Sequence, residues 1–157
     1  MLLLLREGAY IDAEGSMGQT PLHRAAHRRH GDVVQVLVEA GASTTERDNS
    51  NKTPLSRALD SSVKVAYRMI GCMDLNAADI QGTPLHHARG KTEVDMLVNA
   101  GANIEARGSG GATPLNMPYI DIDAMRALVN HDADVNTQDE EGFTPLHTAF
   151  AHVVCPI

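Results

Sequence analysis

Residues 20–29 read TPLHRAAHRR, and the first four letters of this segment return four more times along the 157-residue chain with at most one change. The copies begin at Thr20, Thr53, Thr83, Thr113 and Thr144, at intervals of 33, 30, 30 and 31 residues. Thr caps free N–H groups at a helix start, and Pro at the first helical position gives up a donor that has no partner there. Each copy therefore predicts the beginning of a short helix.

Residues that tolerate a positive φ angle come at the equivalent place just before every copy. They are Gly18, Asn51, Gly82, Gly111 and Gly142. Gly and Asn adopt the left-handed conformation at little steric cost. A tight, hairpin-like loop is therefore expected to lead into each helix.

A second element recurs midway between the copies. The segments LLREGAYIDA, LVEAGASTTE, LVNAGANIEA and LVNHDADVNT, which start at residues 4, 37, 97 and 128, align residue for residue. Each reads as the apolar end of a second helix, closed by a left-handed residue at Gly8, Gly41, Gly101 or Asp132. The leucine run at 2–5 therefore reads as part of a helix. It is too short for a signal peptide, which needs about 7 to 15 apolar residues, or for a membrane span of about 20.

The repeated unit resembles the ankyrin repeat over almost the whole chain. The resemblance implies an all-α, helix-turn-helix-hairpin solenoid in which first helices and hairpin tips line a concave face. Hydrogen bonds from His23, His86 and His147 to Thr and to backbone would tie neighbouring repeats together. The implied organisation is a single ankyrin repeat domain over 1–157, with roughly four complete repeats and a half-repeat at each end: 1–16, 17–49, 50–79, 80–109, 110–140 and 141–157.

The repeats after the first are two or three residues short. In 80–109 and 110–140 the missing residues fall between the two helices, which removes up to about one turn at 3.6 residues per turn. Pro118 shortens its first helix further, because it has no N–H for the helical ladder. We therefore expect an uneven solenoid between Pro84 and Asp123. Neither end carries a polar cap. We therefore expect either that the chain is part of a longer array or that its two half-repeats associate.

Charge and composition narrow the classes of function. The net charge is −7, and residues 1–70 carry nine Lys and Arg against eight Asp and Glu, while 71–157 carry four against twelve. The acidic second half argues against nonspecific binding to nucleic acid or to a membrane, both of which need a basic face. Cys72 and Cys155 lack CxxC spacing, which favours reduced thiols in an intracellular protein, cytoplasmic or nuclear.

The family's variable positions, carried over to this sequence, supply the candidate partner-binding residues. Along the chain these candidates are basic in the first repeats, mostly apolar in the middle repeats, and include an acidic residue in the last. This order indicates a protein or peptide partner whose charges run in the opposite direction. A solvated face without a selected partner is the plain alternative. The candidates are Arg24, His27, Arg28, Lys52, Arg57, Ile80, His87, Met117, Tyr119, Glu140 and Phe143.

Three hypotheses of function remain at this point. The first is a protein-interaction module that is not an enzyme and needs no cofactor. The second is end-to-end self-assembly, in which the orphan half-repeats of two molecules complete each other. The third is a small enzyme or metabolite binder with His87 and Tyr119 in a pocket of the irregular middle repeats. No metal site is expected, because His27 and His30 have the spacing of two ligands but no third ligand nearby.

Overall fold

The computed structural model describes residues 2–151 and divides into two compact units, an N-terminal unit, Met1–Asp74, and a C-terminal unit, Leu75–Ile157. Every regular element among the described residues is an α-helix or a 3-10 turn, with no β-strand, as the sequence predicts. None of the helices in this range has the length and apolarity to cross a membrane. Cys155 lies outside the described residues.

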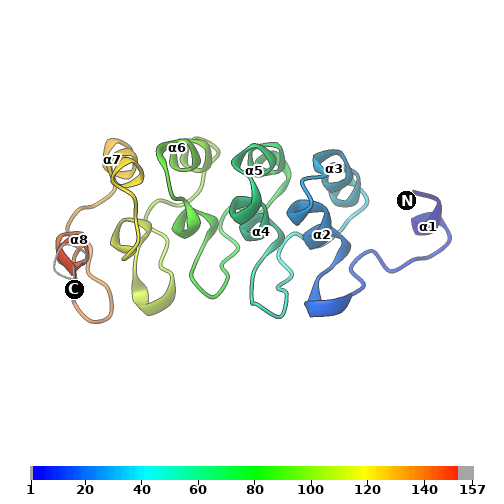
Figure 1. Ribbon diagram of the computed structural model, residues 1–157, viewed down its shortest axis with the longest axis horizontal. Helices are drawn as coiled ribbons and strands as arrows, with labels where there is room; N and C mark the ends of the chain where they lie inside the picture. The colour runs from blue at the N-terminus through cyan, green and yellow to red at the C-terminus, as the bar shows by residue number, and fades with distance from the viewer. Residues whose placement is uncertain (1, 152–157) are drawn as a thin grey trace. The chain divides into compact units, whose positions relative to one another are not determined.

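The N-terminal unit is built from two rows of helices (Figure 1). Helix α2 packs against α4, and α3 packs against α5. Leu22, Leu55 and Met69 are fully buried in this unit. The elements are α1 (Leu2–Arg6), η1 (Ser16–Gly18), α2 (Pro21–His27), α3 (Gly31–Glu39), α4 (Pro54–Ser61), α5 (Val63–Met69) and η2 (Ile70–Cys72).

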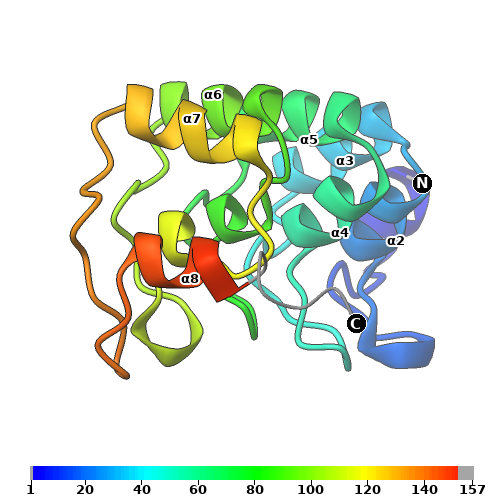
Figure 2. The ribbon, with the colours of Figure 1, turned by 60° about the vertical axis from the view of Figure 1, so that its left-hand side comes forward.

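The C-terminal unit repeats this plan, but single turns, η3 and η5, replace two of its first helices (Figure 2). Helix α6 packs against α7, while the single turn η5 contacts η3 and α8. Leu85, Leu97, Leu115 and Leu128 form its buried core. The elements are η3 (Pro84–His87), α6 (Lys91–Asn99), η4 (Ser109–Gly111), η5 (Pro114–Asn116), α7 (Ile122–Asn130) and α8 (Pro145–Ala151).

The helix starts and the left-handed loop positions agree with the sequence signals. Thr20 Oγ1 accepts the N–H of His23 at 3.4 Å, and Thr53 Oγ1 accepts that of Ser56 at 3.2 Å. At Gly18 a Cβ would lie 2.4 Å from Asn49 Oδ1, so a side chain does not fit there. The φ angle is positive at every position expected to be left-handed: Gly8, Gly18, Gly41, Asn51, Gly82, Gly101, Gly111, Asp132 and Gly142.

The expected shortening of two first helices is confirmed. Helices α2 and α4 run for 7 and 8 residues, whereas η3 has 4 residues and η5 only 3. After η5, Met117 is extended, with φ −65° and ψ 130°, and Pro118 follows. The chain therefore reaches α7 without completing a first helix.

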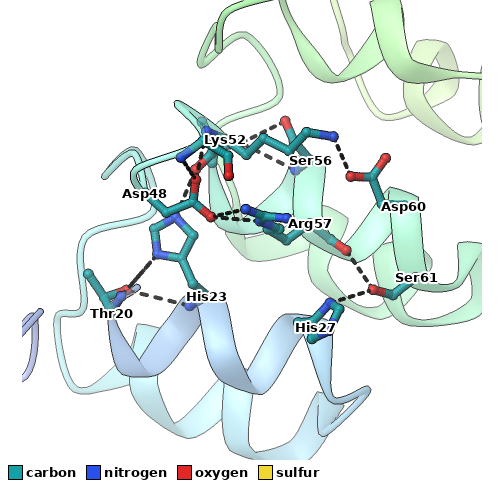
Figure 3. Close-up of polar contacts among 11 residues, drawn as sticks. Thr20, His23, His27, Asp48, Lys52, Ser56, Arg57, Asp60 and Ser61 are labelled. Carbon is teal, nitrogen blue, oxygen red and sulfur yellow. Dashed lines mark hydrogen bonds and ion pairs between the residues drawn. The ribbon is translucent and has the colours of Figure 1, made fainter. Parts of the chain in front are cut away.

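Buried imidazoles join consecutive repeats, as the family resemblance implies for His23 and His86. His23 Nδ1 accepts the N–H of Thr20 at 3.3 Å, and its Nε2–H donates to the carbonyl of Lys52 at 2.9 Å (Figure 3). His86 bridges Thr83 and the carbonyl of Ala112 in the same way, at 3.0 and 3.1 Å. The chain thus fixes one tautomer of each ring, with Nδ1 as acceptor and Nε2 as donor.

The other motifs depart from this arrangement. Asn116 replaces the imidazole and donates through Nδ2 to the carbonyl of Phe143 at 3.1 Å. Ser56 Oγ lies 3.0 Å from Thr53 Oγ1, within its own turn. His147 Nδ1 lies 2.8 Å from Thr144 Oγ1, and its imidazole is exposed. Among the described residues, therefore, His147 joins no further repeat.

We expect His23→Ala to lower the free energy of unfolding by about 1–3 kcal/mol, because it removes a fully buried hydrogen-bonding ring and strands the carbonyl of Lys52. Urea denaturation followed by circular dichroism measures the change. The matched control is His27→Ala, which removes an exposed ring that bonds Ser61 Oγ, and we expect its effect to stay within about 0.5 kcal/mol. Equal losses in the two variants would contradict the role given to His23.

Burial lowers the pKa of His86 below the ordinary value of 6.5, although hydrogen bonding at Ala112 and Thr83 opposes the shift. The unfolded chain therefore takes up the proton first. This contribution to stability is complete above the ordinary pKa and declines as the pH falls through 6.5 toward the folded-state pKa.

We expect His86→Asn to flatten the pH dependence of the urea midpoint between about pH 7 and about pH 5. The variant keeps a side-chain N–H donor, as Asn116 does, but it cannot titrate. His30→Asn, at an exposed histidine, serves as the control for the His→Asn change. If the urea midpoint of His86→Asn depends on pH as steeply as that of the wild type, the His86 ring is not the cause of the pH dependence.

Candidate partner-binding surface

Two of the predicted basic residues are engaged inside the N-terminal unit (Figure 3). Arg57 donates to Asp48 Oδ2 through Nε and lies within 2.6 Å of it through Nη2, and the Asp48 side chain is completely buried. Lys52 Nζ forms an ion pair with Asp60. The positive charges of Lys52 and Arg57 are therefore balanced by carboxylates of the same unit.

Asp48 keeps its negative charge despite burial. Burial alone would raise its pKa, but hydrogen bonds from the backbone N–H groups of Lys52 and Ser50 and from the Arg57 guanidinium outweigh that effect and lower it. The ionised carboxylate holds the hairpin against the first helix through Arg57.

Arg24 and Arg28 are the basic candidates whose charge stays available. They lie four residues apart at α2, their side chains are exposed, and neither forms an ion pair within the described range 2–151. Both line a shallow groove of about 380 Å³, together with Gly15, Gln19 and Pro21. This groove is the part of the N-terminal unit suited to an acidic ligand.

The C-terminal unit contains a larger cavity of about 960 Å³. One wall comes from the segment after η5, with Met117 and Tyr119, and continues into α7 with Ile122 and Met125. The remaining walls come from the end of η3 and from α8; their residues include His87, Arg89, Leu146 and Phe150. The cavity is therefore mainly apolar and lies where the shortened first helices leave space.

The polar groups at this cavity differ in their availability. His87 Nε2 lies 2.7 Å from Asp79 Oδ2, and both side chains are buried. Asp79 Oδ1 also accepts the N–H groups of Gln81 and Gly82, at 2.8 and 3.2 Å. Arg89, by contrast, is exposed and forms no ion pair within the residues that the structure covers. Arg89 is thus the cationic group that a bound ligand can reach.

The structure brings some of the predicted residues together and separates others. His87, Met117 and Tyr119 line the cavity, whereas Ile80, Glu140 and Phe143 lie outside its lining. Phe143 instead contacts the His147 ring, with ring centroids 5.9 Å apart. The predicted His27 is exposed and lies 3.1 Å from Ser61 Oγ through Nδ1.

Sequence reasoning missed several cavity residues: Arg89, Ile122, Met125, Leu146 and Phe150. Met125 aligns with Val34 and Val94, which are 1% and 0% exposed, so it reads as another core position. Two features of the sequence could have indicated that Met125 is less buried: the repeat is short, and Pro118 ends its first helix early.

Within residues 2–151 no group of three or more His, Cys, Asp or Glu side chains is placed to hold a metal ion. The His27 and His30 spacing therefore has no third ligand in this range.

Comparisons with known proteins point to one family. The model for ankyrin repeats (3 copies) matches residues 1–79, and that for ankyrin repeats (many copies) matches residues 121–152. The B-cell lymphoma 3 protein homolog of Mus musculus is 28% identical over 160 residues, which cover 94% of this chain and 36% of that protein. Neurogenic locus notch homolog protein 2 of Homo sapiens is 30% identical over 152 residues, which cover 94% of this chain and 5% of that protein.

Among solved structures, the ankyrin repeat domain of Bcl-3 matches with a TM-score of 0.82 at 26% identity, covering 93% of this chain and 70% of that chain. The chain spans about a third of the length of the B-cell lymphoma 3 relative and 5% of the notch relative. Since a family model matches half of its residues and its motifs begin the expected helices and turns, the chain belongs to the ankyrin repeat family.

Proposed function

We propose that this chain is a protein-interaction module that binds a partner protein or peptide through its first-helix and hairpin surface and carries out no catalysis of its own. The cavity of the C-terminal unit is the observation that carries the proposal. Its lining includes Tyr119, 86% exposed, and Ile122, 63% exposed. Large apolar side chains gathered at an open surface are typical of interaction sites.

The charges assign different tasks to the candidate residues. Arg24 and Arg28 attract an acidic stretch of the partner, because no carboxylate in the described range neutralises them. Lys52 and Arg57 shape the hairpin instead of contacting the partner. Met117 and Tyr119 anchor a bulky apolar side chain of the partner, while Ile80, Glu140 and Phe143 contact it from the hairpins.

A differential pull-down with the 157-residue chain tests the proposal. The test variants are Arg24→Glu with Arg28→Glu, and Tyr119→Ser. The matched controls change exposed residues of α5: Lys64→Glu, and Tyr67→Ser at a tyrosine that is 69% exposed. Proteins retained by wild type and controls but lost from both test variants support the proposal. An identical set of captured proteins on all five baits would overturn it.

With a partner obtained in this way, we expect Arg24→Glu combined with Arg28→Glu to slow association about tenfold at low ionic strength and to flatten its salt dependence. The reason is that the steering charge changes sign while the apolar contacts stay in place. Stopped-flow or interferometry measurements across a salt series give the rate. Lys64→Glu should leave both quantities close to wild type, and a matching slowdown in that control would argue against a localised steering surface.

A further inference from the structure

The repeat that begins at Thr113 lacks most of a first helix. The first helices that follow Thr20, Thr53 and Thr144 have 7, 8 and 7 residues, whereas η5 has 3. The helical segment is therefore four or five residues shorter, which is slightly more than one helical turn, or roughly 6–7.5 Å of helix at about 1.5 Å per residue. The cavity is lined by residues of η3, of the segment after η5, and of α8, so it lies between the elements that flank η5.

Part of the second helix, α7, is uncovered beside the cavity. Val34 and Val94 occupy the same register in α3 and α6, and both are completely buried, although η3, which precedes α6, has only 4 residues. Met125 occupies that register in α7 but is only partly buried, and Ile122, one turn earlier, is 63% exposed. An apolar strip of α7 thus lines the cavity beside the short η5, which α7 contacts.

We propose that the cavity accepts a short amphipathic helix of the partner, which takes the place of the missing first helix; this inference rests on the proposed function. Ile122 and Met125 are three apart on α7, and Leu146 and Phe150 are four apart on α8. These are the spacings of the ridges between which another helix packs. A cavity of about 960 Å³ is at the upper end of the roughly 300–1,000 Å³ range of ligand pockets.

The charges at the cavity define the chemistry of that helix. Arg89 is exposed and has no carboxylate partner within residues 2–151. Asp121 also lines the cavity, but its Oδ1 caps α7 by accepting the N–H of Asp123 at 2.8 Å. The partner helix therefore carries bulky apolar residues at i, i+3 or i+4, and i+7, with Asp or Glu placed against Arg89.

Phage-displayed peptide libraries test this inference on the 157-residue chain. One library fixes bulky apolar residues at helical spacing and varies the remaining positions, and a matched library carries a Pro at its centre, which breaks the helix. We expect enrichment of acidic clones from the helical library alone. Enriched clones are then synthesised, and their affinities are measured by fluorescence anisotropy.

Variants of the chain locate the binding site. We expect Ile122→Ser to weaken binding about tenfold, whereas Val129→Ser, at an exposed apolar residue of the same helix that does not line the cavity, stays within about twofold. Tyr119→Ser, at a cavity residue that is 86% exposed, is the second test variant in case Ile122→Ser does not fold. Arg89→Glu should weaken binding, and a peptide with Lys in place of its acidic residue should restore it.

Four outcomes overturn the inference: no enrichment from the helical library, equal enrichment of the Pro library, equal effects of Ile122→Ser and Val129→Ser, or no rescue of Arg89→Glu. These failures are separate from a failure of the proposed function. If the pull-down still identifies proteins that depend on Tyr119 while the peptide experiment fails, the module binds partners but not through a helix. If the pull-down fails as well, the interaction function itself is lost.

Discussion

The hydrogen bond between the fourth residue of a Thr-Pro-Leu motif and the carbonyl of the next hairpin is the constraint on which the repeat geometry depends. His23 and His86 make this bond from fully or almost fully buried rings, and Asn116 makes it through its amide. A buried carbonyl left without its donor is costly, so the bond fixes the distance at which one hairpin lies from the preceding helix. The apolar residues between the two helix rows then pack at that distance.

The same geometry explains which charges a partner can meet. The residue that follows each motif lies next to an Asp of the hairpin in two repeats, as Arg57 with Asp48 and His87 with Asp79. In the first repeat the equivalent residue is Arg24, and the hairpin position opposite is Gly15, which brings no carboxylate. An exposed arginine in one repeat and a buried ion pair in the next thus arise from a single change in the hairpin.

Local signals in the sequence were enough to predict the helix starts, the left-handed positions and the shortened first helices, because each depends on a few adjacent residues. The internal pairing of Lys52 and Arg57 was not predicted, since Asp60 and Asp48 lie 8 and 9 residues away and approach only after the hairpin folds back. The sequence placed His87 and Tyr119 in a pocket of the middle repeats, and both line the cavity, but the part that α7 and α8 take in it was not predicted, because the exposure of Met125 depends on what three separate segments leave uncovered. An acidic residue at equivalent hairpin positions, in Asp48 and Asp79, was the overlooked clue to the pairing.

The incomplete first helix at Thr113 also bears on how such a chain can change over evolutionary time. In a protein with one closed core, deleting a helical turn disrupts packing throughout. In a repeat array each repeat contacts only its neighbours, so the shortening at η5 stays local, and the cavity lies beside it. Small deletions in a linear array are therefore a direct route to new concave surfaces, without any need to redesign the scaffold around them.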